Sequence, residues 1–371
     1  MIRALTATSL HIPFKQSFKH ASAGRCATQS VWVEVELGNG VCGFGEGCPR
    51  EYVTGESVAS ALKFICRLEP ELHGIAGVSD LKAWVDSHAE LIDANPAAWC
   101  AVELALLDAL ARETAQSVEQ MLALPPVRGS FQYSAVLGAE APEMFGKQLQ
   151  RCLQMGFRDF KVKLSGADED LERVALLKSA PASIGTLRFD ANNLWQTPGE
   201  ALGHLQRLNA PAFAIEEPLA AGNYQGAREI ASASGLKIIL DESLLRIEQL
   251  DQLQSNPDIF IVNLRISKMG GLLRSLKLAR RACALGLPLI IGCQVGETSL
   301  LTRVALSVAG SLAGDALIAQ EGAFGTLLLT HDIVERPLMF GHGGLLDVTP
   351  YDFGSAHGFG IDPMPHIESH S

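Results

Sequence analysis

Apolar and polar residues alternate along the first stretch of the chain, which predicts strands with one buried face. Residues 2–14 read as one strand, and WVEVEL within 30–37 reads as another before the turn sequence GNG at 38–40; this order is typical of a β-meander. From residue 57 the apolar positions recur with a helical period, and AAWCAVELALLDALARE covers 97–113. The pattern therefore predicts an N-terminal α+β module over residues 1–127.

After residue 127 the chain consists of short apolar runs separated by loops and helical segments, a pattern typical of parallel strands with crossover helices. Eight successive units predict a (β/α)8 barrel over residues 128–335. The Gly-rich stretch 336–371 is expected to return to the first module. The eight predicted strands are 131–138, 159–164, 186–192, 212–218, 236–243, 258–264, 287–293 and 316–322.

Composition and charge narrow the class of protein. Of the 371 residues, 47% are hydrophobic and 19% are charged, so the chain is able to bury a large core. The formal net charge of -11 argues against a nucleic-acid partner, because phosphate binding requires an excess of Lys and Arg. The chain has no apolar run of about eighteen residues and no signal-peptide core at its start. We therefore expect a soluble cytoplasmic protein with neither a nucleic-acid nor a membrane partner.

The cysteines are scattered along the chain without C-x-x-C pairs. This distribution favours reduced, buried thiols over a disulfide framework or a zinc site. The eight cysteines are Cys26, Cys42, Cys48, Cys66, Cys100, Cys152, Cys283 and Cys293.

Ionisable residues recur near the ends of five consecutive predicted barrel strands. Successive members of this series are 27, 26, 25 and 27 residues apart, which is one βα unit each time. Because the carboxyl ends of barrel strands form the active-site face, we expect all five side chains to converge on one cavity. The series is Lys163, Asp190, Glu216, Asp241 and Lys268.

The three acids of this series, Asp190, Glu216 and Asp241, predict a metal site. Clustered carboxylates repel one another unless a cation binds them, and oxygen ligands in an open octahedral site suit Mg²⁺. We predict one Mg²⁺ per subunit, with Mn²⁺ as a substitute. The alternative is that each acid caps a helix or pairs with a neighbouring cation, which does not explain why all three share one strand position.

Three lysines accompany the acids. Lys161 and Lys163 lie two residues apart on one strand and therefore face the same side, whereas Lys268 follows the sixth strand, across the barrel. A surface lysine pair is the ordinary interpretation of K-x-K, but the strand position favours the cavity. A lysine has an ordinary pKa of about 10.4, so it needs burial or a nearby metal ion to act as a base near neutral pH.

These motifs resemble the enolase superfamily, specifically its muconate-lactonising branch. They stand in the family's order as KVK at 161–163, DAN at 190–192, EEP at 216–218, DES at 241–243 and RISKMGG at 265–271. The resemblance implies an enolase-like modified barrel with an N-terminal α+β capping domain, and Mg²⁺ bound by the three acids.

The resemblance also implies roles for individual side chains. Lys163 and Lys268 are expected to act as acid and base on opposite faces of the substrate. The supporting residues are expected to be Lys161, Asn192, Glu242, Arg265 and Glu321, with Arg265 standing where many relatives carry a lysine.

The chemistry of such a site agrees with the resemblance. A proton on the carbon next to a carboxylate is weakly acidic, and its removal leaves an enediolate with two negative oxygens. A divalent cation stabilises that charge, and a lysine on each face allows the proton to leave and return. We therefore predict an isomerase.

Two regions point to different substrates. The segments 45–57 and 292–298 resemble specificity segments of dipeptide epimerases, whereas the eighth strand offers Gln320 and Glu321 where those epimerases carry D-x-D for the substrate ammonium. We predict a cycloisomerase, similar to muconate cycloisomerase, that acts on a small carboxylate without a free α-ammonium. The alternatives are a racemase or epimerase of a dipeptide or amino-acid derivative, an acid dehydratase, and a non-catalytic ligand-binding barrel.

Five further residues are candidates for substrate binding. They lie in the capping loops and after the seventh strand, where a solvated loop residue or a small core residue is the ordinary alternative. We expect the partners to be a small-molecule carboxylate and further copies of the chain in a homo-oligomer. The candidates are His20, Arg25, Tyr52, Cys293 and Glu297.

Overall fold

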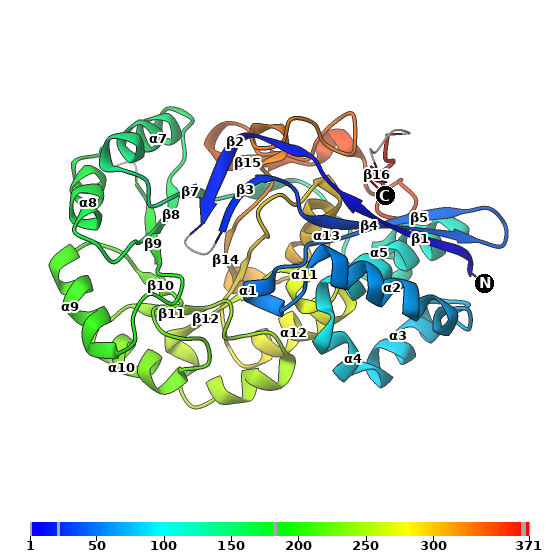
Figure 1. The fold of residues 1–371 in the computed structure, drawn as a ribbon, viewed down its shortest axis with the longest axis horizontal. Helices are drawn as coiled ribbons and strands as arrows, with labels where there is room; N and C mark the ends of the chain where they lie inside the picture. Colours follow the sequence, from blue (N-terminus) through cyan, green and yellow to red (C-terminus); the bar gives the residue numbers. More distant parts are fainter. Residues whose placement is uncertain (1, 21–22, 181–183, 365–368, 371) are drawn as a thin grey trace.

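The N-terminal module is built on an antiparallel sheet. The computed structural model describes residues 2–20, 23–180, 184–364 and 369–370. The sheet has the strand order β16-β1-β4-β5, so the last described residues of the chain pair with its first strand (Figure 1). Its strands are β1 (Ile2–Leu10), β4 (Ser30–Leu37), β5 (Cys42–Gly47) and β16 (Ser369–His370).

The predicted strand over 2–14 is broken, because the chain leaves the sheet after β1. β2 (Pro13–His20) and β3 (Ala23–Ala27) form a separate antiparallel hairpin. The hairpin begins against the loop after the last barrel strand, since the N–H of Lys15 donates to the carbonyl of Leu328 over 2.8 Å. The β2–β3 hairpin thus extends from the N-terminal module to the barrel.

Helices complete this capping domain. The central helix, α5, is buried along almost its whole length, as expected for a helix without a polar face. It packs on β5 at Gly43, Gly45 and Gly47, where an added Cβ would collide with the backbone of α5. The helices are α1 (Glu51–Thr54), α2 (Val58–Leu72), α3 (Val78–Ser87), α4 (Ala89–Ala94), α5 (Pro96–Glu113) and α6 (Val118–Leu122).

The predicted barrel is confirmed, and a parallel strand lies within each of the eight predicted runs. The strands follow one another in sequence order around the sheet, and the N–H of Ser134 donates to the carbonyl of Gln320 over 2.8 Å to join its two ends. The strands are β7 (Ala135–Leu137), β8 (Asp159–Lys163), β9 (Thr186–Asp190), β10 (Ala214–Glu216), β11 (Lys237–Leu240), β12 (Phe260–Leu264), β13 (Leu289–Ile291) and β14 (Leu317–Gln320).

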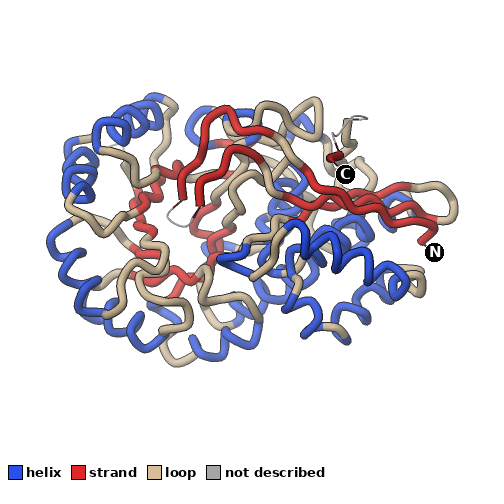
Figure 2. The backbone as a smooth tube through the Cα atoms, viewed as in Figure 1, coloured by secondary structure: helices blue, strands red, loops and turns tan. Residues whose placement is uncertain are grey.

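Helices surround the barrel strands (Figure 2). The regular βα repeat changes after β11, where the 3-10 helix η1 (Ile247–Leu253) follows, and after β12, where the short α11 (Ile266–Met269) precedes a longer helix. The longer helices are α7 (Pro142–Gln154), α8 (Glu169–Ser179), α9 (Pro198–Leu208), α10 (Tyr224–Ser234), α12 (Leu272–Ala284) and α13 (Ser299–Ala309).

The last part of the chain returns across the barrel. β15 pairs with β6 in a two-stranded antiparallel ribbon, so the tail covers the entry to the first barrel strand. The remaining elements are β6 (Ser130–Gln132), β15 (Leu345–Asp347), η2 (Pro257–Ile259), η3 (Gly314–Ala316), η4 (Gly325–Leu327), η5 (His342–Gly344) and η6 (Thr349–Tyr351).

The core is continuous across both modules, and a second apolar cluster fills the inside of the barrel. Side chains of five consecutive strands, β10 to β14, meet there, in keeping with the packed interior of other barrels of this type. The cluster consists of Ala214, Ile239, Ile261, Ile290 and Ala319.

Buried polar contacts join the capping domain to the barrel. Glu46 on β5 accepts a hydrogen bond from the hydroxyl of Thr298 at the start of α13 over 2.6 Å. Glu103 on α5 accepts one from the N–H of Leu273 on α12 over 2.9 Å. Each carboxylate faces the first turn of a barrel helix, where backbone N–H groups lack partners.

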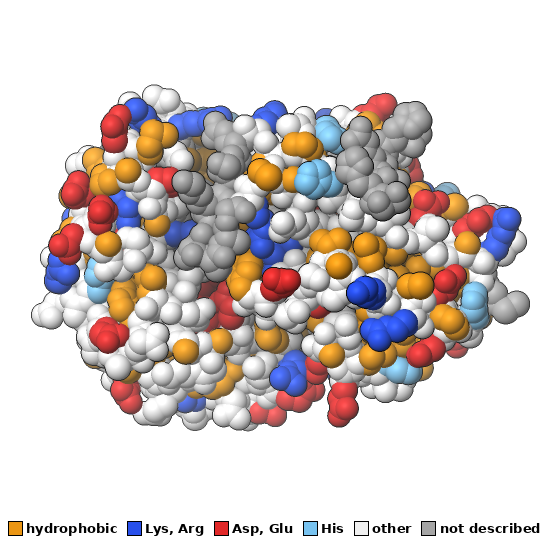
Figure 3. Space-filling model, in the orientation of Figure 1, with side chains coloured by type: hydrophobic (Ala, Val, Ile, Leu, Met, Phe, Trp, Pro, Cys, Tyr) orange, Lys and Arg blue, Asp and Glu red, His pale blue; other side chains and the backbone are white. Residues whose placement is uncertain are grey.

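The surface charges, the helices and the cysteines bear on the predictions about partners, membrane spans and thiol burial. Acidic and basic side chains are interspersed on the face drawn in Figure 3. Within the described residues, no helix is both long and apolar enough to cross a bilayer. All eight cysteines are free, but Cys26, Cys66 and Cys283 are exposed, so the prediction of burial is wrong for these three.

Candidate active site

Five ionisable side chains lie at or just beyond the carboxyl ends of successive barrel strands. Lys163, Asp190 and Glu216 are the last residues of β8, β9 and β10 and pair in register. Asp241 directly follows β11, and Lys268 lies on α11, just after β12. Because β9, β10 and β11 separate β8 from β12 in the sheet, the two lysines approach the barrel mouth from different sides.

Lys161 occupies the centre of the cluster. Its side chain is buried, and its ammonium lies 2.8 Å from Glu216 Oε2, 3.1 Å from Glu321 Oε2 and 3.2 Å from Asp190 Oδ2. Burial lowers the pKa of Lys161, but the three carboxylates outweigh it and hold this pKa well above its usual range. Lys161 is therefore a fixed cation that bridges three acids.

The ammonium of Lys163 is held on one side only. It donates to Asp190 Oδ2 over 3.0 Å and to Asn192 Oδ1 over 2.9 Å. Asn192 has a left-handed backbone with φ of 44°, which is strained for a residue other than glycine. The side chain of Lys163 is 12% exposed, whereas that of Lys161 is 3% exposed. Lys163 is thus the more accessible of the pair.

Lys268 is buried and fully hydrogen-bonded. Its ammonium donates to the carbonyl of Asp241 over 2.7 Å, to Asp241 Oδ1 over 2.8 Å and to the carbonyl of Asn263 over 2.8 Å. An ammonium has three N–H donors, and all three of these are engaged.

Arg265 directly follows β12 and contacts two of the three acids, Asp241 and Glu216. Its guanidinium donates to Asp241 Oδ2, lies 3.7 Å from Glu216 Oε1 and donates to Gln294 Oε1 over 3.2 Å. The alternative interpretation, in which each acid pairs with a cation, therefore describes these contacts. Arg265 lies beside two of the acids, Glu216 and Asp241.

The donor set still fits a divalent cation. Among the described residues no three acidic, His or Cys side chains approach closely enough to enclose an ion, because Lys161 and Arg265 lie between the acids. However, carboxylates on three neighbouring strand ends are the hard ligands that Mg²⁺ prefers. Glu216 Oε2 lies near Lys161 yet accepts no hydrogen bond of regular geometry, and burial raises the pKa of Glu216.

Two residues that sequence reasoning missed hold the acids in place. Glu217 is buried with a left-handed φ of 41° and accepts hydrogen bonds from the N–H groups of Asp241 and Ser243, each over 2.7 Å. Asn263 donates to Glu216 Oε1 over 3.1 Å. The doubled acid of EEP was a signal for Glu217, and a single polar residue in the apolar run FIVNL was the available signal for Asn263.

A second missed group holds Glu321 inside the barrel. Arg188 is fully buried and donates to Glu321 Oε1 over 3.0 Å, to Ser134 Oγ over 2.8 Å and to both oxygens of Asp159. With Lys161 on Oε2, both oxygens of Glu321 are engaged. Arg188 precedes Asp190 by two residues on the same strand, and that alternation was the available signal.

Of the remaining candidates, Arg25 and Tyr52 lie in the capping loops, and Glu297 lies in the loop between β13 and α13. The Arg25 guanidinium stacks 5.4 Å from the ring centre of Tyr52 and lines a cavity of about 520 Å³ with it in the capping loops. Glu297 Oε1 accepts the N–H of Gln294 over 2.6 Å and so orders its own loop.

Three other candidates complete the set. Cys293 is partly buried, and burial is the main cause that raises the pKa of its thiol. Glu242 is partly buried, and burial followed by the charge of Asp241 raises its pKa. His20 is the last residue of β2, and its side chain lies outside the described part of the chain.

Both modules match known protein families. The family described as mandelate racemase / muconate lactonizing enzyme, N-terminal domain, matches residues 2–123. The family described as enolase C-terminal domain-like matches residues 144–367. The second match alone covers more than half of the chain.

Individual relatives are similar over most of their length. The chain is 26% identical to a hydrophobic dipeptide epimerase of Enterococcus faecalis over 81% of this chain and 84% of the relative. It is also 26% identical to an N-succinyl-L-Arg/Lys racemase of Bacillus cereus, over 90% and 89% of the two chains.

Solved structures share the fold. A muconate lactonizing enzyme from Pseudomonas fluorescens, complexed with muconolactone, has a TM-score of 0.86 and 25% identity over 98% of this chain and 96% of that one. The dipeptide epimerase from Enterococcus faecalis, complexed with Mg and the dipeptide L-Leu-L-Tyr, has a TM-score of 0.83 and 24% identity over 97% and 99%.

Proposed function

The chain belongs to the enolase superfamily, in the family of mandelate racemase and muconate lactonizing enzyme, and on this premise we propose that it is a magnesium-dependent isomerase of small carboxylates. It moves a proton on the carbon next to the substrate carboxylate. The observation that carries this proposal is the row of Lys163, Asp190, Glu216, Asp241 and Lys268 at the barrel mouth.

The proposed roles follow from what each side chain contacts. Asp190, Glu216 and Asp241 would hold Mg²⁺, which when bound stabilises negative charge on the substrate's carboxylate oxygens. Lys163 transfers the proton at its Nζ. Two of its N–H groups are held by Asp190 and Asn192, and the third has no acceptor among the described residues.

Cycloisomerisation is the reaction that this arrangement supports best. A lysine that exchanges a proton with a substrate needs an N–H directed at the reacting carbon, within hydrogen-bond reach. Lys163 has one, whereas all three N–H groups of Lys268 are donated to Asp241 and Asn263. A lactone-forming isomerisation needs proton transfer on a single face, so Lys163 suffices, and Lys268 contributes a fixed positive charge.

The eighth strand supports a substrate without a free α-ammonium. A substrate ammonium would need a carboxylate whose charge is not already neutralised, but Arg188 and Lys161 each pair with an oxygen of Glu321. Removing either partner from a buried acid is costly. Glu321 therefore serves to fix Lys161.

Racemisation of an N-acylated amino acid is a second candidate function. The similarity to an N-succinyl-L-Arg/Lys racemase favours it, and an acylated nitrogen also carries no positive charge. This reaction would require Lys268 to release one of its three hydrogen bonds. Dehydration and simple ligand binding have no comparable observation in their favour.

Proton NMR in heavy water tests the proposed function. The enzyme with Mg²⁺ is incubated with three panels: unsaturated diacids related to cis,cis-muconate, N-acylated amino acids, and L,L-dipeptides. We expect lactone formation with deuterium incorporation in the first panel. Exchange confined to the second panel would favour the racemase, exchange of dipeptides would contradict the assignment for Glu321, and no exchange by any carboxylate would overturn the proposal.

A further inference from the structure

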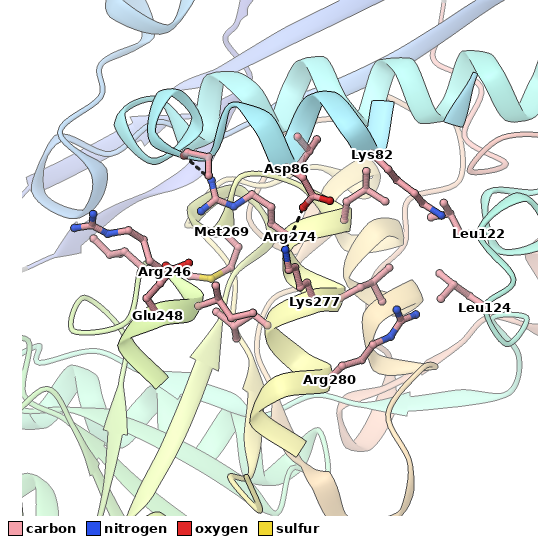
Figure 4. Close-up of a pocket in the computed structure, with 17 residues that line it drawn as sticks. Lys82, Asp86, Leu122, Leu124, Arg246, Glu248, Met269, Arg274, Lys277 and Arg280 are labelled. Atoms are coloured by element: carbon pink, nitrogen blue, oxygen red, sulfur yellow. Dashed lines mark hydrogen bonds and ion pairs between the residues drawn. The ribbon is translucent and has the colours of Figure 1, made fainter. Parts of the chain in front are cut away.

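A cavity of about 440 Å³ lies away from the barrel mouth, between the capping domain and the outer helices of the barrel. Its walls come from α3 and the end of α6 on one side, and from η1, α11 and α12 on the other (Figure 4). The lining includes neither the lysines nor the acids of the candidate active site. The cavity is therefore a separate feature of the molecule.

The floor of this interdomain cavity is apolar. Its volume falls within the range of small-molecule sites, roughly 300–1,000 Å³, which are mostly apolar with a few polar groups. The buried apolar side chains of the lining are Val85, Leu122, Met269, Leu276 and Leu278.

The rim is basic, although the chain as a whole carries a net charge of -11. Only two acids, Asp86 and Glu248, lie in the lining beside five cations. The five cations are Lys82, Arg246, Arg274, Lys277 and Arg280.

Two of these cations are available to a ligand. Arg274 pairs with Asp93, and Lys277 pairs with Asp86 over 3.1 Å. Lys82 and Arg280 form no hydrogen bond or ion pair with any residue that the structure describes. Figure 4 shows them extending from α3 and α12, on opposite walls, toward the end of the cavity where Leu122 lies.

We propose that the interdomain cavity binds a small organic carboxylate with a compact apolar body. The apolar part covers the leucine and methionine side chains of the floor, which are stabilised by removal from water. The carboxylate lies between Lys82 and Arg280, where a guanidinium offers two parallel N–H donors to its oxygens. The ligand thus bridges the capping domain and the barrel.

Occupancy has two consequences for the rest of the molecule. A ligand that binds only the folded state raises the unfolding temperature by mass action. The ligand also contacts Met269, which directly follows Lys268 on α11. The site is thus next to the element that carries a candidate active-site lysine, although binding does not depend on the proposed function.

Calorimetric titration of the full chain with 2-naphthoate tests the proposal, with the neutral 2-naphthamide as a matched probe. We expect 2-naphthoate to bind with one site per chain and the amide to bind at least about tenfold more weakly, because it lacks the charge that Lys82 and Arg280 recognise. The double variant Lys82→Gln/Arg280→Gln should bind 2-naphthoate more weakly by a similar factor. Both side chains are exposed, so these substitutions do not disturb the core.

Two further variants separate this site from others. Lys63→Gln/Arg67→Gln removes two exposed charges from α2 outside the cavity and should leave binding unchanged. Ala89→Trp fills the cavity from α4 and should abolish binding.

Several results would overturn the proposal. Equal affinity for 2-naphthoate and 2-naphthamide would show that the cavity binds the apolar ring and does not recognise the carboxylate. Loss of binding in Lys163→Ala instead of the double variant would place the probe in the candidate active site. No binding, together with a change in oligomeric state by light scattering in Lys82→Gln/Arg280→Gln, would show that this face joins copies of the chain.

Discussion

Lys163 and Lys268 differ at the level of individual hydrogen bonds. Lys163 retains an N–H without an acceptor among the described residues, while the ammonium of Lys268 is held by three oxygens. This difference is invisible in the sequence, where both lysines simply follow strands. It supports the proposal that Lys163 transfers the proton and that Lys268 contributes a fixed charge.

Lys163→Ala should therefore lower turnover by about a hundredfold or more, the usual scale for loss of a general acid or base. Turnover is measured with the substrate found by NMR, and circular dichroism checks that the variant is folded. Lys163→Arg keeps the charge but holds its proton at all accessible pH values, so it should remain equally slow. Turnover in Lys163→Ala within a few-fold of the unmodified enzyme would contradict the assignment.

Arg188 matters for stability because it pairs with the buried Glu321 and the partly buried Asp159. Arg188→Met leaves Glu321 with one cation and Asp159 without its guanidinium partner. The free energy of unfolding should therefore fall by about 3–5 kcal/mol. Arg207→Met is the control, because Arg207 pairs with Asp168 on the surface and exposed pairs contribute about 0–1 kcal/mol. Urea denaturation of both variants measures the difference, and equal losses would contradict the buried network.

Among the elements, α5 and β5 pack so closely that a Cβ added at Gly43, Gly45 or Gly47 would collide with the backbone of α5. Gly45→Ala should destabilise the protein by roughly 3 kcal/mol or more, because the new Cβ would meet the carbonyl of Ala101 and overpacking forces backbone shifts. Gly203→Ala on α9 is the opposite case, since nothing lies within 4 Å of its new Cβ. It should stabilise by up to about 1 kcal/mol. Thermal unfolding of both variants tests this contrast.

The contact between α5 and α12 predicts a pH dependence of stability. Burial raises the pKa of Glu103 from an ordinary 4.5 to about 7, so between these values the folded chain binds more protons than the unfolded chain. The free energy of unfolding therefore falls as pH rises from about 4.5 to about 7, and the contribution of Glu103 is constant above that. The fall is roughly 3 kcal/mol.

Glu103→Gln removes this titration. Denaturation curves between pH 5 and pH 8 should show a smaller loss of stability in the variant than in the unmodified chain. Identical slopes would show that Glu103 does not titrate in this range.

The elements also show why the fold was largely predictable. Each barrel strand lies within a short, mostly apolar run that is followed by a loop and a helical segment, so all eight could be located from the sequence. The 3-10 helix after β11 and the departure of β2 from the first sheet were not predicted, and the second depends on a contact far along the chain. Lys15, for example, is held by Leu328.

At the scale of the whole molecule, the site combines residues that the sequence predicted with residues that it did not. The five ionisable residues share a spacing, which made them visible. Arg188 and Asn263 are polar residues within strands but belong to no motif, and their partners Glu321 and Glu216 are identified only when the barrel brings the strands together. The doubled acid of EEP marked Glu217, but the sequence did not indicate its partners, which are the N–H groups of Asp241 and Ser243.

The central claim is that the acids of three strand ends bind a metal that makes the α-proton removable. The most direct measurement is exchange of the substrate's α-proton in heavy water after dialysis against a chelator, followed by addition of Mg²⁺ and, separately, Mn²⁺. The account predicts that exchange disappears on dialysis and returns with either ion, and that Asp241→Asn remains folded but needs more metal. Full exchange in the metal-free protein would contradict the account.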